Sequence, residues 1–123
     1  MISLASFCFD VSVSEIFGTL ICGGTLEIAS SDFLRDPPNL LKSIYSSNIT
    51  VLQGTSSIFK SLIDVGFTCN DKKITLLCGG ETLTIELASK LLERGFTLWN
   101  FFGATEATVS TILYNVQKIE GNL

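Results

Sequence analysis

A run of mixed side chains near the end of this 123-residue chain, residues 100–106, combines an amide, two aromatic rings, a glycine, a hydroxyl and a carboxylate. Neither a core strand nor an ordinary turn needs such a mixture. Gly103 would allow a positive φ or close backbone approach, and Phe102 offers a flat apolar face. The Thr105 hydroxyl and the Glu106 carboxylate are oxygen groups of the kind that Mg²⁺ and phosphate sites use. The run is therefore typical of a turn that faces a nucleotide and a metal ion.

Two earlier turns, residues 9–12 and residues 78–81, also have an unusual composition. Each follows a short apolar segment and stands before a helical pattern. In a parallel sheet, ligands bind at the carboxyl ends of the strands, where such turns meet. We therefore expect the three turns to line one crevice.

Short apolar strands and amphipathic helices must position these turns. The expected strands are Ile2–Phe7, Thr25–Ile28, Thr50–Gln53, Lys73–Cys78, Phe96–Trp99 and Thr111–Val116. The expected helices are Val11–Cys22, Ile58–Val65, a helix from Pro38 or Asn39 to Ser47, and a helix from Thr84 to Arg94. Strands and helices in this alternating order predict an α/β fold, with a mainly parallel sheet and helices on both faces.

Local sequence patterns predict where two of these helices begin. The first helix has apolar residues at helical spacing, and Ser12 and Glu15 have the S-x-x-E spacing of a capping box at its start. Thr84 is the expected N-cap of the last helix. Glu86 and Lys90 in that helix are spaced as an i, i+4 ion pair.

The overall composition narrows the class of function. With 46% hydrophobic and 16% charged residues and a mean hydropathy of +0.47, the chain is more apolar than a typical domain, whose charged share is about 25%. We expect some of this apolar surface to lie against further protein. The net charge of −4, without a Lys/Arg cluster, argues against a nucleic-acid partner. No apolar run approaches the roughly 18 residues of a membrane span and no signal peptide is visible, so no membrane partner is expected.

The spacing of the cysteines and the lack of histidine exclude two kinds of functional site. Cys8, Cys22, Cys69 and Cys78 show no C-x-x-C spacing, and the chain contains no histidine. A zinc site or a histidine-based catalytic triad therefore cannot be assembled. The four cysteines are expected to be reduced, buried thiols, as in a cytoplasmic protein.

Taken together, the three turns resemble the adenylation domains of nonribosomal peptide synthetases, within the adenylate-forming enzyme superfamily. Residues 9–17 resemble the F-D-x-S segment of that family, residues 79–83 its G-G-E-x-L segment, and residues 100–106 its N-x-Y-G-P-T-E segment. Phe102 stands where tyrosine is usual and keeps the stacking face, whereas Ala104 stands where proline is usual and removes a constraint on φ.

The resemblance covers essentially the whole chain. It implies that residues 1–123 are the central part of an AMP-binding adenylation domain, a partial subdomain of the large N-terminal domain. The family's phosphate loop and its C-terminal subdomain have no counterpart in this sequence. We therefore expect the chain to be inactive by itself.

The resemblance also implies a reaction and a set of site residues. An amino-acid carboxylate would attack the α-phosphate of ATP, and the resulting aminoacyl adenylate would load the phosphopantetheine thiol of a carrier protein that works with condensation domains. Asp10 would hold the substrate ammonium group, Glu106 would bind Mg²⁺, and Thr105 would contact phosphate. The nucleotide would bind at Gly79, Gly80, Glu81, Asn100, Phe102 and Gly103. The pocket for the amino acid would consist of Asp10, Val11, Ser14, Gln53, Leu77, Gly79, Phe101, Val109 and Ser110.

Each of these roles has a plainer alternative. An aspartate before a helical pattern is usually an N-cap, and Thr105 and Glu106 would otherwise be a capping threonine and a solvated acid. Phe102 could be a core aromatic, and the glycine pair an ordinary turn. For the whole chain, the alternative is a degenerate remnant that acts as a binding or interaction module. A dinucleotide-binding oxidoreductase is disfavoured, since no G-x-G-x-x-G follows a strand.

Overall fold

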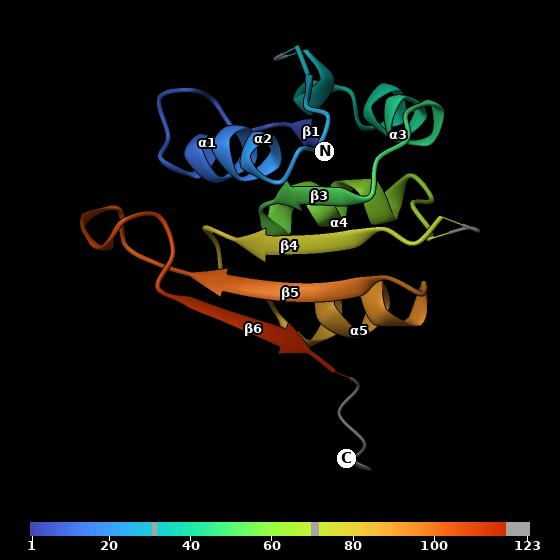
Figure 1. The fold of residues 1–123 in the computed structure, drawn as a ribbon. Coiled ribbons are helices and arrows are strands. Elements are labelled where there is room, and N and C mark those ends of the chain that lie inside the picture. The colour runs from blue at the N-terminus through green and yellow to red at the C-terminus, as the bar shows by residue number, and fades with distance from the viewer. Residues whose placement is uncertain (31, 70–71, 118–123) are drawn as a thin grey trace.

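The computed structural model describes residues 1–30, 32–69 and 72–117, and in this part of the chain six strands form one sheet (Figure 1). The end of the expected domain, residues 118–123, lies outside the described residues. The strands are β1 (Ile2–Ser3), β2 (Glu27–Ile28), β3 (Val51–Gly54), β4 (Thr75–Gly79), β5 (Thr97–Phe102) and β6 (Ile112–Val116). Their order is β2-β1-β3-β4-β5-β6, and every neighbouring pair is parallel except β5 and β6. This topology confirms the predicted α/β fold.

Helical segments connect the strands. They are α1 (Val11–Val13), the π-helix η1 (Ser14–Gly18), α2 (Thr19–Ile21), the 3₁₀ turn η2 (Phe33–Arg35), α3 (Pro37–Ser46), α4 (Ser56–Asp64), α5 (Ile85–Glu93) and the 3₁₀ turn η3 (Thr105–Ala107). α1, η1 and α2 follow one another without a break, so they form one helical segment with a π-helical centre. All four predicted helices are therefore present, although α4 begins slightly earlier than expected, at Ser56.

The strand register separates the side chains of the sheet into two sets. Leu52, Leu76 and Leu98 lie beside one another on β3, β4 and β5, and all three are fully buried. They belong to the hydrophobic core that also contains side chains of α3, α4 and α5. Because side chains alternate along a strand, the residues next to these leucines face the other side of the sheet.

The α1–η1–α2 segment covers part of that other face. Gln53 follows Leu52 on β3 and is buried, and its Nε2 atom donates a hydrogen bond to Ser14 Oγ in η1 (2.9 Å). In Figure 1, α4 and α5 lie behind the strands. Helices therefore cover both faces of the sheet, as the sequence predicts.

The largest differences from the predicted strand ranges are at the C-terminal ends of β1 and β5. β1 ends at Ser3 and not at Phe7, because the chain leaves the sheet for the loop that precedes α1. β5 continues past Trp99 to Phe102. It pairs with β4 on one side and with β6 on the other, and these pairings include the polar residue Asn100.

The predicted capping box at the first helix is wrong. The residue at the N-cap position is Asp10, which has helical φ and ψ values of −59° and −27° and makes no capping hydrogen bond with its side chain. The Ser12 hydroxyl donates to Phe9 O (2.7 Å), whereas the Glu15 carboxylate accepts a hydrogen bond from Ser3 Oγ (2.7 Å). The acid that would complete the box is therefore engaged with β1, and the helix-cap alternative for Asp10 does not hold.

The prediction of four buried thiols is wrong for two of the cysteines. Cys8 and Cys22 are exposed because they lie in the turns on either side of the first helical segment. Cys69 is partly buried and Cys78 is buried, and all four are free thiols as expected. Burial raises the pKa of Cys78, so this thiol stays protonated at neutral pH.

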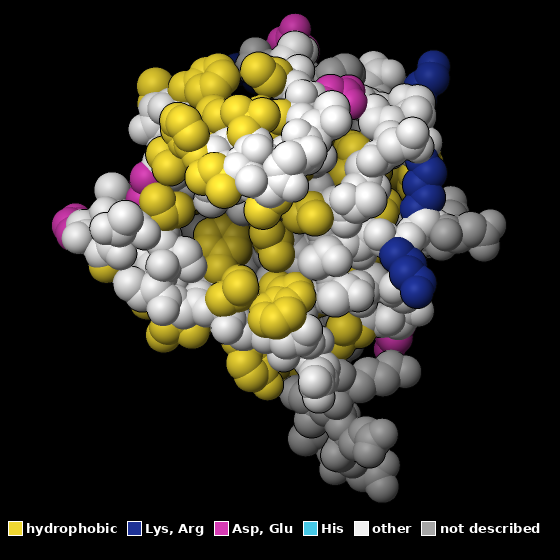
Figure 2. Space-filling view, viewed as in Figure 1, with side chains coloured by type: hydrophobic (Ala, Val, Ile, Leu, Met, Phe, Trp, Pro, Cys, Tyr) yellow, Lys and Arg dark blue, Asp and Glu magenta, His cyan; other side chains and the backbone are white. Residues whose placement is uncertain are grey.

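Exposed apolar side chains gather on the α1–η1–α2 segment, in the upper left of Figure 2. Phe17, Leu20 and Ile21 have exposed fractions of 57%, 56% and 83%. A second exposed set lies on the edge strand β6, at Ile112, Leu113 and Tyr114. Within the described residues, the structure has no helix with the length and apolar character needed to cross a membrane.

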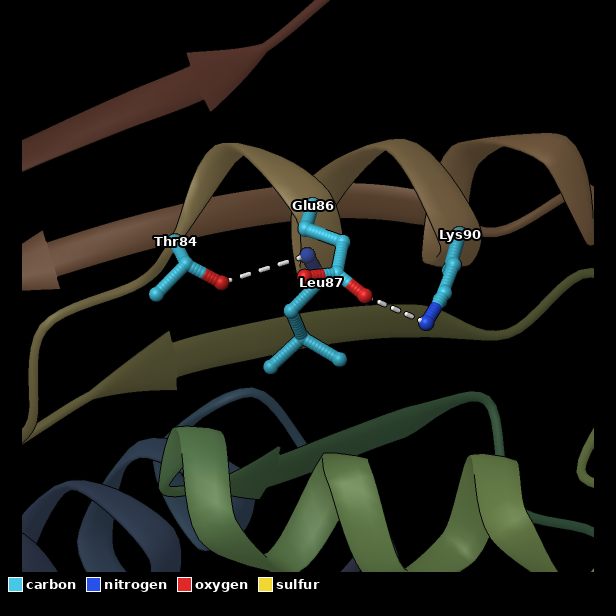
Figure 3. Close-up of polar contacts among 4 residues, drawn as sticks. All are labelled: Thr84, Glu86, Leu87 and Lys90. Atoms are coloured by element: carbon cyan, nitrogen blue, oxygen red, sulfur yellow. Dashed lines mark hydrogen bonds and ion pairs between the residues drawn. The ribbon is translucent and has the colours of Figure 1, made fainter.

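Helix α5 begins where the sequence predicts (Figure 3). Thr84 Oγ1 accepts a hydrogen bond from Leu87 N (3.3 Å), which identifies Thr84 as the N-cap. Lys90 Nζ lies 2.7 Å from Glu86 Oε1, and both side chains are exposed. The hydrogen bond from Lys90, together with its charge, holds the pKa of Glu86 below its ordinary value. Both local patterns predicted for this helix are therefore confirmed.

Replacement of Thr84 by alanine should lower the free energy of unfolding by about 1 kcal/mol, because the N-cap hydrogen bond is lost. Lys90→Ala removes an exposed ion pair from the same helix and should have a smaller effect, since exposed pairs contribute little. Urea denaturation of the wild type and both variants, followed by circular dichroism, measures the two changes. A larger effect of Lys90→Ala would contradict the assignment of Thr84 as the cap.

Candidate functional site

A cavity of about 240 Å³ opens where β1, β3 and β4 end, and we call it the strand-end cavity. It is lined by Leu4, Ala5, Phe9, Val11, Glu15, Gln53, Gly54, Thr55, Ile58, Gly79, Gly80 and Phe101. Two of the three predicted turns therefore meet at this cavity, one through Phe9 and Val11 and the other through Gly79 and Gly80. Phe101 of β5 belongs to the third run.

Gly79 shapes this cavity because β4 and β5 approach closely beside it. A Cβ atom at position 79 would lie 2.5 Å from the Phe101 ring and 2.5 Å from the Phe101 carbonyl oxygen. No side chain fits there, so the aromatic ring lies against the end of β4. The next residue, Gly80, has a φ of +77°, a conformation that favours glycine. Packing and backbone geometry thus account for both glycines of the turn.

The polar side chain of Gln53, in the wall of the strand-end cavity, is hydrogen-bonded to residues of the first helical segment. Gln53 Nε2 donates to Ser14 Oγ (2.9 Å) and to Val11 O (3.3 Å), and Ser14 Oγ donates to Val11 O (2.7 Å). Only 3% of Gln53 is exposed, and a buried amide needs such partners. The amide of Gln53 is therefore satisfied within the protein. The other side chains that line the cavity are apolar except for Glu15 and Thr55.

The residues predicted to form the amino-acid pocket fall into three groups in the structure. Val11, Gln53, Gly79 and Phe101 line the strand-end cavity. Ser14 and Leu77, again with Gln53, line a second hollow of about 450 Å³ that adjoins η1, α2, β3 and β4. Asp10, Val109 and Ser110 line neither. The predicted pocket residues therefore do not all lie at one cavity, and the three that line neither hollow lie in connecting loops.

The loop after β5 is held by a close contact within its own backbone. A Cβ atom at Gly103 would lie 2.5 Å from Ser110 Cα and 2.6 Å from Val109 O. Gly103 is thus required for close approach, but the approaching backbone belongs to the same loop. The positive φ values lie at Thr108 (65°) and Val109 (69°), where β-branched residues carry backbone strain. This packing fixes residues 109–110 against the end of β5.

Glu81 binds helix α4 and does not line the strand-end cavity. Its Oε2 atom accepts hydrogen bonds from Ser57 Oγ (2.7 Å) and Ser57 N (2.9 Å), in the first turn of α4. These hydrogen bonds hold the pKa of Glu81 below its ordinary value. Glu81 therefore fastens the turn after β4 to the neighbouring helix.

The other predicted nucleotide and metal residues lie on or just beyond the end of β5. Asn100 is half-buried within the strand, and Phe102 is 69% exposed at its end. These two residues share one face of β5, and Phe101 between them points to the opposite face. Thr105 and Glu106 form the short turn η3, and both are exposed. The strand thus separates the predicted nucleotide residues Asn100 and Phe102 from Phe101, which is predicted to line the amino-acid pocket.

Glu106 is a single carboxylate and not part of a larger metal-binding cluster. In the described ranges, no group of three or more His, Cys, Asp and Glu side chains could hold a metal ion. Mg²⁺ is commonly bound through one or two carboxylates together with substrate phosphates and water. One exposed carboxylate beside the Thr105 hydroxyl therefore fits a magnesium ion that arrives with a phosphate, and it does not fit a metal site built from protein alone.

Four acids in or beside the motif turns divide into two pairs. Glu15 and Glu81 accept hydrogen bonds from the backbone and from serine hydroxyls. Asp10 and Glu106 have no side-chain hydrogen bond to any residue that the structure describes. The second pair are therefore the carboxylates available to a ligand.

Sequence reasoning missed several residues of the strand-end cavity. Leu4, Ala5, Thr55 and Ile58 line it, and none of them stands out by its type. Glu15 was recognised only as half of a capping box. An acid four residues after Val11, within an apolar helical pattern, was the signal that could have marked it as inward-facing.

Comparisons with known proteins were consistent with this geometry. A family model described as AMP-binding enzyme matches residues 1–122. The chain is 32% identical over 113 residues to the PKS-NRPS hybrid synthetase ATPKS of Aspergillus niger, covering 92% of this chain and 6% of that protein. It is 39% identical over 112 residues to the D-alanine–D-alanyl carrier protein ligase of Bacillus cytotoxicus, covering 86% of this chain and 22% of that protein.

A solved structure shows the same fold. The holo form of a four-domain nonribosomal peptide synthetase, bound to AMP and glycine, matches with a TM-score of 0.86 and 32% sequence identity. The match covers 94% of this chain and 9% of that one. The chain thus spans less than a quarter of the length of each of these three proteins.

The stabilising effect of the Glu81–Ser57 link should depend on pH. Because the folded-state pKa of Glu81 is lowered, its carboxylate stabilises the fold above the ordinary pKa, and this contribution is lost as the pH falls through the lowered value. Glu81→Gln should lower the free energy of unfolding at neutral pH by less than about 1 kcal/mol, since the group is exposed. Once the wild-type carboxyl is protonated, the two proteins should unfold alike.

Urea denaturation of both proteins at neutral and acidic pH measures this difference. Glu93→Gln is the control, because Glu93 is an exposed acid on α5. An equal loss of stability by Glu81→Gln at both pH values would contradict the prediction.

Proposed function

The chain belongs to the AMP-binding enzyme family, and from this premise we propose that residues 1–123 are the central part of an amino-acid-activating adenylation domain. The parent enzyme would join an amino-acid carboxylate to the AMP part of ATP with release of pyrophosphate. It would then pass the aminoacyl group to the phosphopantetheine thiol of a carrier protein. Condensation domains of the same cytoplasmic synthetase would use the loaded amino acid in nonribosomal peptide synthesis.

The strand-end cavity is the observation that carries this proposal. Residues of the motif turns meet there at the carboxyl ends of parallel strands, where α/β sheets bind their ligands. A volume of about 240 Å³ suits a small molecule. Asp10 does not itself line the cavity, but its neighbours in sequence, Phe9 and Val11, do, and its carboxylate has no hydrogen bond within the described residues. An α-ammonium group is a fitting partner for such a carboxylate, because charge-assisted hydrogen bonds are strong.

ATP would bind on the other face of β5. The exposed ring of Phe102 offers a flat surface for adenine, and Asn100 offers an amide on the same face of the strand. The Gly79–Gly80 turn would lie along the base. Glu106 would hold Mg²⁺ and Thr105 would contact a phosphate oxygen. The metal, when bound, would offset the negative charge of the two anions that must meet.

The cavity walls favour an uncharged amino acid of medium or large size. The polar groups of Gln53 and Ser14 are already hydrogen-bonded to each other. The other walls are largely apolar, as at Ile58 and Phe101. The acid in the lining, Glu15, already accepts three hydrogen bonds from residues 3–5. A charged side chain would therefore be buried there without a free partner, which is energetically costly.

A second candidate follows from one of the relatives. The Bacillus cytotoxicus protein is named as a ligase for D-alanine and D-alanyl carrier protein, and it is 39% identical to this chain. Its reaction would belong to the same class, with a smaller substrate. A cavity that extends from Phe9 to Phe101 has more room than a methyl side chain needs, so we favour a larger amino acid.

Pyrophosphate exchange with single amino acids tests the proposal. The intact polypeptide that contains this sequence should exchange, in the presence of ATP and Mg²⁺, with an uncharged amino acid of medium or large size. A preference for D-alanine would favour the second candidate. No exchange with any amino acid would favour a non-catalytic remnant that acts as a binding module. Residues 1–123 alone should show no exchange.

Two substitutions should separate the amino-acid side from the nucleotide side. Asp10→Ala should raise the KM for the amino acid about ten- to a hundredfold, because a charge-assisted hydrogen bond is lost, and leave the KM for ATP unchanged. Glu106→Gln should raise the Mg²⁺ concentration needed for half-maximal exchange and leave the amino-acid KM unchanged. A parallel loss of ATP affinity in Asp10→Ala, or an unchanged Mg²⁺ titration in Glu106→Gln, would count against the respective role.

A further inference from the structure

Glu15 is an almost completely buried acid, with 1% of its surface exposed. Its carboxylate accepts hydrogen bonds from Ser3 Oγ (2.7 Å), Ala5 N (3.1 Å) and Leu4 N (3.4 Å). The same side chain lines the strand-end cavity. An acid in the cavity wall therefore joins the π-helix η1 to the end of β1.

The identity of the partners explains why this residue is a glutamate. β1 ends at Ser3, and the N–H groups of Leu4 and Ala5 find their acceptor in Glu15 and not in a neighbouring strand. A carboxylate accepts hydrogen bonds and donates none, so it matches three donors at once. A glutamine of the same shape would turn an N–H₂ group toward at least one of them. Position 15 thus requires the carboxylate and not only its size.

These hydrogen bonds close a loop at its base. Residues 5–15 leave the sheet after β1 and run through α1 into η1, and Glu15 fastens the end of this loop to its start. Phe9 and Val11 lie on the loop and line the cavity, and Asp10 stands between them. Phe9 is 67% exposed, so packing gives the tip of the loop little support. The position of Asp10 therefore depends on hydrogen bonds, including those of Glu15 at the base of the loop and the one from Gln53 Nε2 to Val11 O.

We propose that Glu15 is a positioning residue, which fixes the loop that presents Asp10 to the α-ammonium group of the amino-acid substrate. The inference rests on the proposed function, because that function assigns the loop to the amino-acid side of the site. All side-chain hydrogen bonds of Glu15 within the described residues go to Ser3 in β1 and to the two residues that follow it. The turn after β4, on the nucleotide side, is fastened separately, by Glu81 to α4. Loss of the Glu15 carboxylate should therefore weaken amino-acid binding and spare ATP binding.

The test compares Glu15→Gln with Glu27→Gln in the intact polypeptide that contains this sequence. Glu27 is a matched control, because it lies on the neighbouring strand β2 and accepts hydrogen bonds from Ser43 Oγ and Ser47 Oγ, but is exposed and does not line the cavity. Pyrophosphate exchange is measured while the amino acid and ATP are varied separately. Glu15→Gln should raise the amino-acid KM by about tenfold or more, since buried donors lose their acceptor, and leave the ATP KM unchanged. Glu27→Gln should change neither.

Two further variants test the role of Glu15 independently of whether Glu15→Gln folds and of whether its effect passes through Asp10. Ser3→Ala removes one donor and leaves the backbone hydrogen bonds in place, so it should raise the amino-acid KM in the same direction by a smaller factor. It replaces Glu15→Gln if that variant does not fold. Combining Glu15→Gln with Asp10→Ala should add no further rise beyond that of Asp10→Ala alone, because Glu15 acts through Asp10.

The outcomes distinguish a failure of the positioning role of Glu15 from a failure of the proposed function. Equal rises in both KM values, or an unchanged amino-acid KM with a lower melting temperature, would leave Glu15 a purely stabilising residue and overturn the positioning role. A full additional rise in the double variant would also overturn it. Absence of exchange by the wild type would instead overturn the proposed function, and the positioning role with it.

Discussion

The pairing of β3, β4 and β5 in one parallel register determines the rest of the structure. It places Leu52 beside Leu76 in the core and turns Gln53 to the opposite face, where the cavity lies. A slip by one residue would expose the leucines and bury the cavity residues, so burial of the core fixes the site at the same time. The same pairing sets Gly79 beside Phe101, and only glycine allows that approach. Stability and site geometry are therefore consequences of one set of strand contacts.

Features with local signals could be predicted from the sequence, and features with distant partners could not. The alternation of strands and helices and the N-cap at Thr84 depend on neighbours within a few residues, and both agree with the structure. The capping pattern at Ser12 and Glu15 has the correct spacing, but the carboxylate binds Ala5 N, ten residues earlier in the chain. β5 extends through Asn100 because strands on both sides pair with it. In each failure, a tertiary contact overrides a local preference.

The α1–η1–α2 segment shows that helical spacing does not reveal which face is buried. Its apolar residues recur as a helix requires, yet Phe17 and Ile21 are exposed, whereas Ser12 and Glu15 are buried. Amphipathicity indicates two chemically different faces and leaves open what covers each of them. Here hydrogen bonds to β1 and to Gln53 hold the polar face against the sheet. The pocket residues on this segment were therefore identifiable by their motif and not by their hydrophobic pattern.

The acids in and beside the motif turns fall into two groups by their hydrogen-bond partners, and the ligand-binding roles that we propose belong to the group without them. Glu15 and Glu81 accept backbone hydrogen bonds at the base of a turn, so the protein itself satisfies them. Asp10 and Glu106 lack a side-chain hydrogen bond within the described residues, and each lies in a segment held by other contacts, at Glu15 for the first and at Gly103 for the second. A carboxylate that is held in place but unpartnered attracts a cation at little cost in ordering. The reacting groups of both substrates are anionic, and each substrate would be held through a positive group, the amino acid through its ammonium at Asp10 and ATP through its magnesium ion at Glu106.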